Sequence, residues 1–205
     1  YLTEGYNVIC HYHTEKPNID GVKLIKGEFT SETGVEEFIK NFQSLECEVD
    51  VLINNAASFF IADKWESINK SQIDEVFHVN FQVPLRLIQY FIKSMIRAKW
   101  GRIVNISSIS VEHGGNPASL AYTTSKAALE TMTRSLSKST ANLGVLINAI
   151  RVGLTDTEFH KRNPSKSISD RVKQIPMGRM ARPDEIANTI FFYGSDHNTF
   201  TTGSI

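Results

Sequence analysis

One short apolar segment of the chain reads Gly101-Arg-Ile-Val-Asn-Ile-Ser-Ser108 and lies between two much longer helical patterns, at 71–99 and 120–142. Its length and its β-branched residues are typical of a strand that is buried on both faces. Similar short runs recur at 7–12, 22–26, 49–53 and 145–150. Strands that alternate with helices predict a parallel sheet with helices on both faces, the doubly wound α/β class. No linker or repeat interrupts the pattern, so we expect one domain over residues 1–205.

The helical patterns carry their own start and stop signals. Apolar residues repeat at helical spacing over 35–45, Ser71 is the predicted N-cap of the pattern 71–99, and Gly144 follows the pattern 120–142. Pro183 opens a last helix that we expect to reach Tyr193. In sheets of this class ligands bind at the carboxyl ends of the strands, so we expect the loops after the strands to line one site.

The composition argues against several classes of partner. Lys plus Arg and Asp plus Glu both number 22, so the net charge is zero, and we expect no nucleic-acid or membrane partner. No apolar run approaches the roughly 20 residues of a membrane span, and the first residues do not resemble a signal peptide. Cys10 and Cys47 lack metal-ligand spacing and a disulfide framework. We therefore expect no metal site and a cytoplasmic protein with two reduced thiols.

Tyr122 and Lys126 are the candidate chemical pair. They stand four residues apart in the predicted helix 120–142 and therefore share one face of it. A tyrosine is a poor acid–base catalyst with a pKa near 10, but a nearby ammonium favours the phenolate. Ser107 and Ser108 end the preceding strand, where a hydroxyl could hold a substrate oxygen. The spacing alone is weak, because most such pairs are ordinary helix surface.

The order of the motifs is more specific than the pair. Asn54-Asn55-Ala56-Ala57 follows a buried strand, the segment 101–108 follows the long helix, and both precede Tyr122. With these motifs the chain resembles the classical short-chain dehydrogenase/reductase family over nearly its whole length. The resemblance implies a Rossmann-like fold and a hydride transfer between a nicotinamide cofactor and a carbonyl or alcohol.

The resemblance also assigns catalytic roles. Tyr122 is expected to be the general acid/base, and Lys126 to lower its pKa and to hydrogen-bond the nicotinamide ribose. Ser108 is expected to orient the substrate oxygen, with Ser107 as the competing choice. Asn80 matches the asparagine that holds a water in the proton relay, and its alternative is a residue that only kinks the helix.

Further residues match the cofactor-binding positions of the family. We expect Asn54, Asn55 and Ala56 to support the sheet and to lie beside the adenosine part of the cofactor. Val152-Gly153 stands where the family has Pro-Gly, which relaxes the backbone beside the nicotinamide. Thr155 and Thr157 are candidates for the carboxamide and the pyrophosphate, or else a helix N-cap and a loop residue. The complete set comprises His13, Thr14, Glu28, Phe29, Asn54, Asn55, Ala56, Tyr122, Lys126, Val152, Gly153, Thr155 and Thr157.

The choice of cofactor depends on the end of the second strand of the family pattern, His11-Tyr-His-Thr-Glu-Lys16. NAD-preferring members place an acidic residue there, and none stands at the strand end in this chain. His13, Thr14 and Lys16 could meet a 2′-phosphate, so we favour NADP(H) over NAD(H). Glu28-Phe29 replaces the usual Asp-Val at the adenine, and the alternative for Glu28 is a solvated carboxylate.

One family feature is absent from these residues. The Gly-rich loop that cradles the pyrophosphate between the first strand and the first helix has no counterpart in the 205 residues. We therefore expect a fragment trimmed at both ends, without the first strand and the last strand of the family pattern.

The substrate is less well determined. We expect residues 155–176, which are polar and basic, to form a substrate lid or else a solvated loop. A short link after the strand at 7–12 is similar to pteridine and dihydromonapterin reductases, which would imply a pterin imine; a 3-oxoacyl carrier-protein reductase or a sugar or alcohol dehydrogenase is the alternative. Phe59, Phe60 and Trp65 could form an aromatic wall or belong to the core.

Two other classes of function stay open. A catalytically silent nucleotide-binding scaffold or sensor usually loses the tyrosine or the lysine, and this chain keeps both. A structural protein without cofactor would be favoured if the Gly-rich loop were naturally lost. The resemblance also implies a homo-oligomer, a dimer or a homotetramer, through the helices at 71–99 and 120–142.

Overall fold

The structure is a computed structural model and describes residues 1–158 and 168–205. Every strand pairing in it is parallel, which confirms the predicted fold class. The strands form two hydrogen-bonded groups. One group pairs β1 with β2, and the other has the order β3-β4-β5; within the described residues β1 and β3 are not paired. The strands are β1 Val8–Tyr12, β2 Val22–Lys26, β3 Val51–Asn54, β4 Gly101–Ser108 and β5 Val145–Val152.

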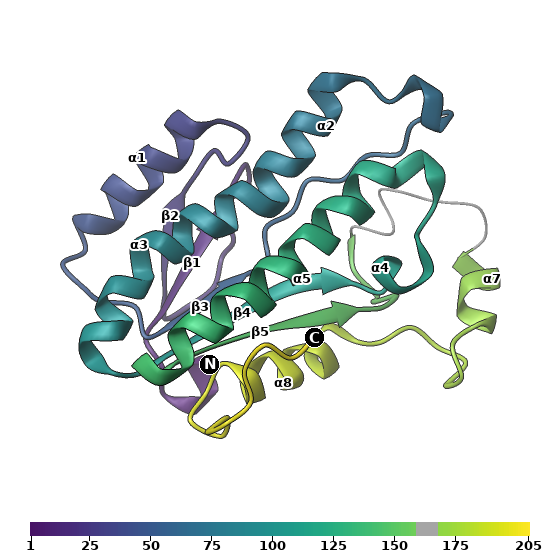
Figure 1. Cartoon of the computed structure of the whole chain (residues 1–205). Helices are drawn as coiled ribbons and strands as arrows, with labels where there is room; N and C mark the ends of the chain where they lie inside the picture. Colours follow the sequence, from purple (N-terminus) through teal and green to yellow (C-terminus); the bar gives the residue numbers. More distant parts are fainter. Residues whose placement is uncertain (159–167) are drawn as a thin grey trace.

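The helices lie on both sides of the strands. Helices α1, α2, α3 and α5 cover one face and α8 lies on the other (Figure 1). Strand β4 shows why, because alternate side chains of a strand point to opposite faces. Asn105 Nδ2 donates to Thr133 Oγ1 of α5 at 2.9 Å, whereas Arg102 Nε donates to the carbonyl of Asn198, beyond α8, at 3.0 Å. The principal helices are α1 Glu32–Gln43, α2 Lys70–Phe77, α3 Val83–Ala98, α5 Leu120–Thr140 and α8 Pro183–Tyr193.

The apolar core lies between the strands and the helices α1, α3 and α5. Its members are aliphatic and aromatic side chains that come from every one of these elements. A representative set is Val35, Phe38, Leu87, Phe91, Ile103, Leu129 and Ile147. This packing fixes α5, and with it Tyr122 and Lys126, against β4 and β5.

The predicted helix at 71–99 is interrupted. A π-helical turn, η3 His78–Gln82, separates α2 from α3. The predicted N-cap Ser71 is wrong: Asn69 caps α2, because its Oδ1 accepts from the backbone N–H of Gln72 at 3.0 Å while Gln72 Oε1 accepts from the backbone N–H of Asn69 at 3.1 Å. The predicted ends at Gly144 and Pro183 are confirmed, with Gly144 in the left-handed region at φ 83°.

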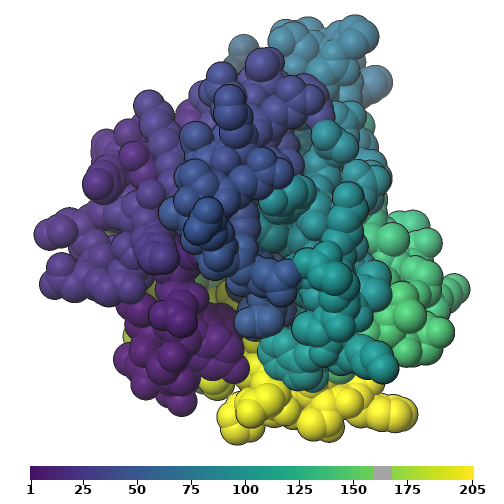
Figure 2. Space-filling view, turned by 90° about the vertical axis from the view of Figure 1, so that its left-hand side faces the viewer, coloured from purple at the N-terminus to yellow at the C-terminus, as the bar shows by residue number. Residues whose placement is uncertain are grey.

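The two ends of the chain lie close together. The rings of Tyr1 and Phe191 are 5.0 Å apart, and the space-filling view shows the first and last residues on the same side of the molecule (Figure 2). The C-terminal residues run beside β5, where the backbone N–H of Gly203 donates to the carbonyl of Ile147 at 2.7 Å. The structure assigns no strand to residues 202–205.

The remaining elements are short. They are η1 Leu2–Glu4, η2 Trp65–Ser67, α4 Ser110–His113, η4 Pro117–Ser119, η5 Ala141–Leu143 and α7 Ile168–Lys173. Helices α4 and α7 lie near the carboxyl ends of β4 and β5 (Figure 1). None of the helices described is long and apolar enough to span a bilayer.

Candidate active site

Ser108, Tyr122 and Lys126 meet at the carboxyl end of β4. Ser108 is the last residue of β4, and Tyr122 and Lys126 lie in the first two turns of α5. The Ser108 side chain lowers the pKa of the Tyr122 hydroxyl, and Lys126 Nζ lies 5.8 Å from the centre of the Tyr122 ring. The three side chains that the sequence placed 4 and 14 residues apart therefore form one cluster.

The ammonium of Lys126 is buried, with 2 % of the residue exposed. It donates to the carbonyl of Ile106 in β4 at 2.7 Å. Burial lowers the pKa of Lys126 to about 8. An ammonium has three N–H donors, and within residues 1–158 and 168–205 the acceptor recorded for it is Ile106 alone. The group therefore retains the capacity to donate to a ligand.

Tyr122 is largely buried beside this ammonium. Burial raises the pKa of its hydroxyl, and the hydrogen bond with Ser108 lowers it in part. Lys126, which the sequence led us to expect to lower this pKa, is not among the causes that act on it in this structure, and its ammonium donates to the carbonyl of Ile106. The ring of Phe59 stands edge-on to Tyr122 with centres 5.0 Å apart, so at least one of the three predicted wall aromatics adjoins the site.

Asn80 is fully buried in the π-helical turn η3. Its Oδ1 accepts from the backbone N–H of Ser58 at 2.8 Å, and its Nδ2 donates to the carbonyl of Ser58 at 3.0 Å and to Ser125 Oγ at 2.9 Å. The Asn80 side chain therefore holds the loop after β3 against α5. Its contact on α5 is Ser125, the residue before Lys126. Its position in a π turn agrees with the kink alternative, and such turns are frequent at functional sites.

The two serines at the end of β4 have different surroundings. Ser107 is 2 % exposed, and its hydroxyl donates to Glu130 Oε1 on α5 at 2.7 Å. The Glu130 carboxylate in turn accepts from Arg151 of β5 at 2.9 Å. This pair was not among the residues predicted from the sequence, although Glu130 lies one turn after Lys126 and Arg151 is the one charged residue of β5.

His13 and Glu28 are brought together at the carboxyl ends of β1 and β2. Their side chains form an exposed contact of 2.6 Å, and Thr30 donates its hydroxyl to Glu28 at 2.7 Å and its backbone N–H at 3.0 Å. These hydrogen bonds lower the pKa of Glu28 to about 2, and the bond from the Thr30 hydroxyl has the largest effect. Thr14 is exposed nearby.

Phe29 lies in the core, 5 % exposed, and its ring stacks on that of His11 with centres 3.9 Å apart. Its side chain is therefore not free to face an adenine, and only its backbone could do so.

The remaining cofactor candidates lie at the ends of β3 and β5. Asn54 is buried and donates to Asn105 Oδ1 at 2.8 Å, which fits its expected support of the sheet, whereas Asn55 is exposed and Ala56 half-buried. The carbonyl of Val152 accepts from the backbone N–H of Ile109 at 3.0 Å.

The loop after β5 is held by its own threonines. Thr155 Oγ1 donates to the carbonyl of Gly153 at 3.2 Å, and Thr157 Oγ1 to the carbonyl of Thr155 at 3.5 Å. These bonds engage both hydroxyls within the loop, which agrees with the alternative of a loop residue and shows no N-cap contact among the described residues.

The predicted substrate lid at 155–176 is described only in part. Its residues 159–167 lie outside the described residues. Helix α7 carries Arg171 and Lys173 beyond the carboxyl end of β5 (Figure 1), and Lys173 pairs with Asp170 at 2.9 Å. A bridge between Thr155 and Ala181 closes the base of the segment.

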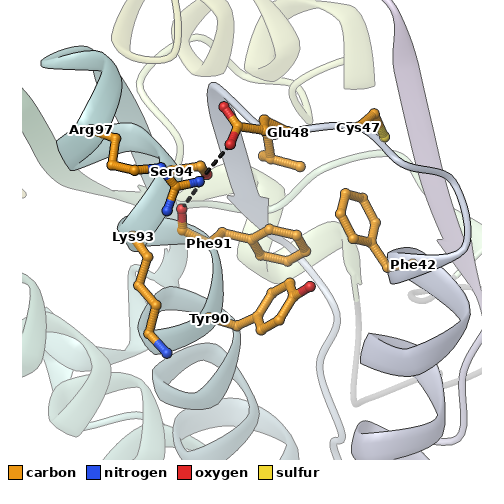
Figure 3. A pocket seen from close by; sticks show the side chains of 9 residues that line it. Phe42, Cys47, Glu48, Tyr90, Phe91, Lys93, Ser94 and Arg97 are labelled. Carbon is orange, nitrogen blue, oxygen red and sulfur yellow. Dashed lines mark hydrogen bonds and ion pairs between the residues drawn. The ribbon is translucent and has the colours of Figure 1, made fainter.

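Two hollows lie outside this cluster. One of about 240 Å³ opens between α1 and α3 at the amino-terminal edge of the strands, with Phe42 and Phe91 in its wall and the ion pair of Glu48 and Arg97 at its rim (Figure 3). The other, of about 1110 Å³, lies between the start of α1 and α2 and reaches Thr30. In the described part of the chain no group of His, Cys, Asp and Glu could hold a metal ion.

Comparison with known proteins decides the family. A family profile described as enoyl-(acyl carrier protein) reductase matches residues 2–205. The chain belongs to the classical short-chain dehydrogenase/reductase family. As a short-chain dehydrogenase/reductase, it is an NAD(P)-dependent oxidoreductase.

Relatives of this short-chain dehydrogenase/reductase carry related names. The chain is 35 % identical to a 3-oxoacyl-(acyl-carrier-protein) reductase of Aquifex aeolicus, over 93 % of the chain and 77 % of the relative. It is 32 % identical to an acetoacetyl-CoA reductase of Shinella zoogloeoides, over 98 % of the chain and 85 % of the relative.

Solved structures confirm the fold of this family member. A 3-oxoacyl (acyl-carrier-protein) reductase of Agrobacterium tumefaciens with NADP bound is 24 % identical, with a TM-score of 0.83 over 96 % of the chain and 81 % of that structure. A 4-hydroxyisoleucine dehydrogenase with NADH and succinate is 23 % identical, with a TM-score of 0.89 over 99 % and 86 %.

The residues present fit the nicotinamide half of the cofactor. The buried Lys126 ammonium keeps unused donors at the site, and the loop after Val152 and Gly153 lies at the carboxyl end of β5. The 205 residues contain no Gly-rich turn for the pyrophosphate.

Proposed function

We propose that the protein reduces a carbonyl group at the expense of NADPH, with Tyr122 as the proton donor and Ser108 as the group that holds the substrate oxygen. One observation carries this proposal: Lys126 Nζ, which is buried, lies 5.8 Å from the centre of the Tyr122 ring, and the Ser108 side chain at the end of β4 lowers the pKa of the same tyrosine. Ser107, the competing choice, has its hydroxyl engaged by Glu130, which supports the assignment of Ser108.

The chain's own residues supply the proton chemistry. The bound nicotinamide supplies the hydride. Ser108 donates a hydrogen bond to the carbonyl oxygen, and Tyr122 delivers its hydroxyl proton to that oxygen as negative charge develops. Lys126 Nζ lies 5.8 Å from the centre of the Tyr122 ring, and we propose that its positive charge favours the phenolate once Tyr122 has given up its proton. Asn80 acts on the same cluster by holding the loop at Ser58 against α5.

NADP(H) is the proposed cofactor, in preference to NAD(H). His13 stands at the end of β1, where an acidic residue would serve a ribose 2′-OH, and it already pairs with the carboxylate of Glu28 at 2.6 Å. A 2′-phosphate would offer His13 a second anionic partner. The shift of His13 from Glu28 to the phosphate would leave Glu28 free to accept from the adenine amino group.

The proposed substrate class is a 3-oxoacyl thioester. This proposal is supported by the names of relatives that are about a third identical over most of their length. A pterin is the second candidate, and the edge-on contact of Phe59 with Tyr122 is the observation that favours a planar ring beside the catalytic hydroxyl.

A substrate panel tests the function. The full-length protein is incubated with NADPH or NADH and with acetoacetyl thioesters, dihydropterins or sugars, and cofactor absorbance is followed. We expect NADPH oxidation with a thioester. Cofactor binding without turnover of any substrate would instead support a silent nucleotide-binding scaffold.

We also propose a homo-oligomer, a dimer or tetramer, through α2, α3 and α5. Large apolar side chains at Ile73 on α2 and Leu120 on α5 are exposed in the single chain, which supports such a contact. Light scattering at micromolar concentration would refute it by finding a monomer. The cytoplasmic location stays a prediction.

A further inference from the structure

A partly buried ion pair joins α5 to β5 near the strand end that carries Ser108. Arg151 Nε and Nη2 donate to the two oxygens of Glu130, both at 2.9 Å. The side chain of Glu130 is 2 % exposed and that of Arg151 is 26 % exposed. A two-pronged contact of this kind fixes both partners in direction as well as in distance.

The pair also holds β4. Ser107 of β4 stands opposite Arg151 of β5 in the strand register, so both side chains point to the α5 face. The Ser107 hydroxyl donates to the same carboxylate oxygen of Glu130 as Arg151 Nε. Burial would raise the pKa of Glu130, but the hydrogen bonds from Arg151 and Ser107 lower it overall. The carboxylate is therefore an ionised clamp between two strands and a helix.

Arg151 reaches a second carboxylate on the other side of Ser108. Its Nη1 donates to Glu112 in α4, the short helix that begins two residues after Ser108. The backbone between them is tied as well: Ser108 Oγ accepts from the backbone N–H of Ser110 at 3.2 Å. One guanidinium thus reaches β4 through Glu130 and contacts α4, the element after the serine, directly.

We propose that Arg151 is a positioning residue for the reaction: through Glu130 and Ser107 it fixes the end of β4, and through Glu112 it fixes the turn that follows Ser108. The inference rests on the proposed function of Ser108. Arginine suits this position because its planar fork serves two carboxylates at once, which a lysine ammonium does less well. A misplacement of about 1 Å in a catalytic group can cost on the order of 10²-fold in rate.

Three variants and a control test the proposal in steady-state assays of the full-length protein. Arg151→Ala removes the clamp, Arg151→Lys restores the charge without the fork, and Ser107→Ala removes only the link to β4. Arg97→Ala is the control, because Arg97 also pairs with a glutamate but lies at the opposite edge of the strands. The thermal midpoint of each variant is measured so that assays are run well below it.

We expect Arg151→Ala to lower kcat at least about tenfold while KM for NADPH stays within twofold of its native value. Arg151→Lys should recover part of the loss, Ser107→Ala should lower kcat in the same direction, and Arg97→Ala should leave kcat unchanged.

An unchanged kcat in Arg151→Ala would overturn the inference, and so would an equal loss in Arg97→Ala. If Arg151→Ala does not fold, the test depends on Ser107→Ala. A native kcat in Ser107→Ala then overturns the inference by itself. Lack of turnover by the native protein would overturn the proposed function instead, which separates the two failures.

Discussion

Replacing Lys126 by methionine should remove a pH dependence of stability that the native side chain creates. Lys126 is 2 % exposed, and burial lowers its pKa from 10.5 to about 8. Below pH 8 the folded protein carries the full cost of the buried ammonium. Between pH 8 and 10.5 the folded state loses that proton while the unfolded state keeps it, so stability rises with pH.

The size of this effect follows from the shift. Each unit of pKa difference corresponds to about 1.4 kcal/mol, so Lys126 should add about 2.5 kcal/mol to the free energy of unfolding between pH 7 and pH 10. The native protein should gain this amount relative to Lys126→Met, because all other titrating groups are common to both.

Urea unfolding at pH 7 and pH 10 measures the difference. Lys138→Met is the matched control, since Lys138 lies exposed on the same helix α5 and should behave like the native protein. Equal pH dependence in the native protein and in Lys126→Met would refute the reasoning, because it would show that the ammonium is not desolvated.

Three further predictions concern other parts of the chain. Arg102→Ala should lower the free energy of unfolding by about 3 kcal/mol, because the carbonyls of Ser195 and Asn198 beyond α8 lose the donor that this 5 % exposed arginine supplies; urea titration with a loss below ~1 kcal/mol would contradict this. Gly144→Ala should cost about 2 kcal/mol or more, since φ is 83° and the added Cβ would lie 2.0 Å from the Lys99 carbonyl oxygen; an unchanged thermal midpoint would argue against it. His13→Asp should raise KM for NADPH about tenfold relative to that for NADH, and an unchanged ratio in kinetic assays would remove His13 from cofactor selection.

Local signals made most of the fold predictable. The strands at 22–26 and 101–108 are short and β-branched between helical patterns, and Gly144 and Pro183 mark helix ends by backbone rules that need no tertiary contact. The start of α2 was misplaced by two residues because Ser71 and Asn69 are both good caps, and the side chain of Gln72 decides between them.

Long-range contacts set the limits of the site prediction. Ser107 and Ser108 are alike in sequence, and only Glu130, which lies 23 residues after Ser107, distinguishes their surroundings. Arg151 escaped notice for the same reason. Phe29 was expected beside an adenine, but the stacking of His11 on its ring places it in the core, a contact between β1 and the turn after β2 that spacing does not reveal.

The most direct test of the account compares NADPH oxidation by the native full-length protein and by Tyr122→Phe with an acetoacetyl thioester as substrate, while NADPH binding is followed by fluorescence. We expect kcat to fall by at least about 10²-fold, the scale of general acid–base catalysis, and NADPH binding to be retained. Equal kcat in the two proteins would contradict the assignment of Tyr122 as the proton donor.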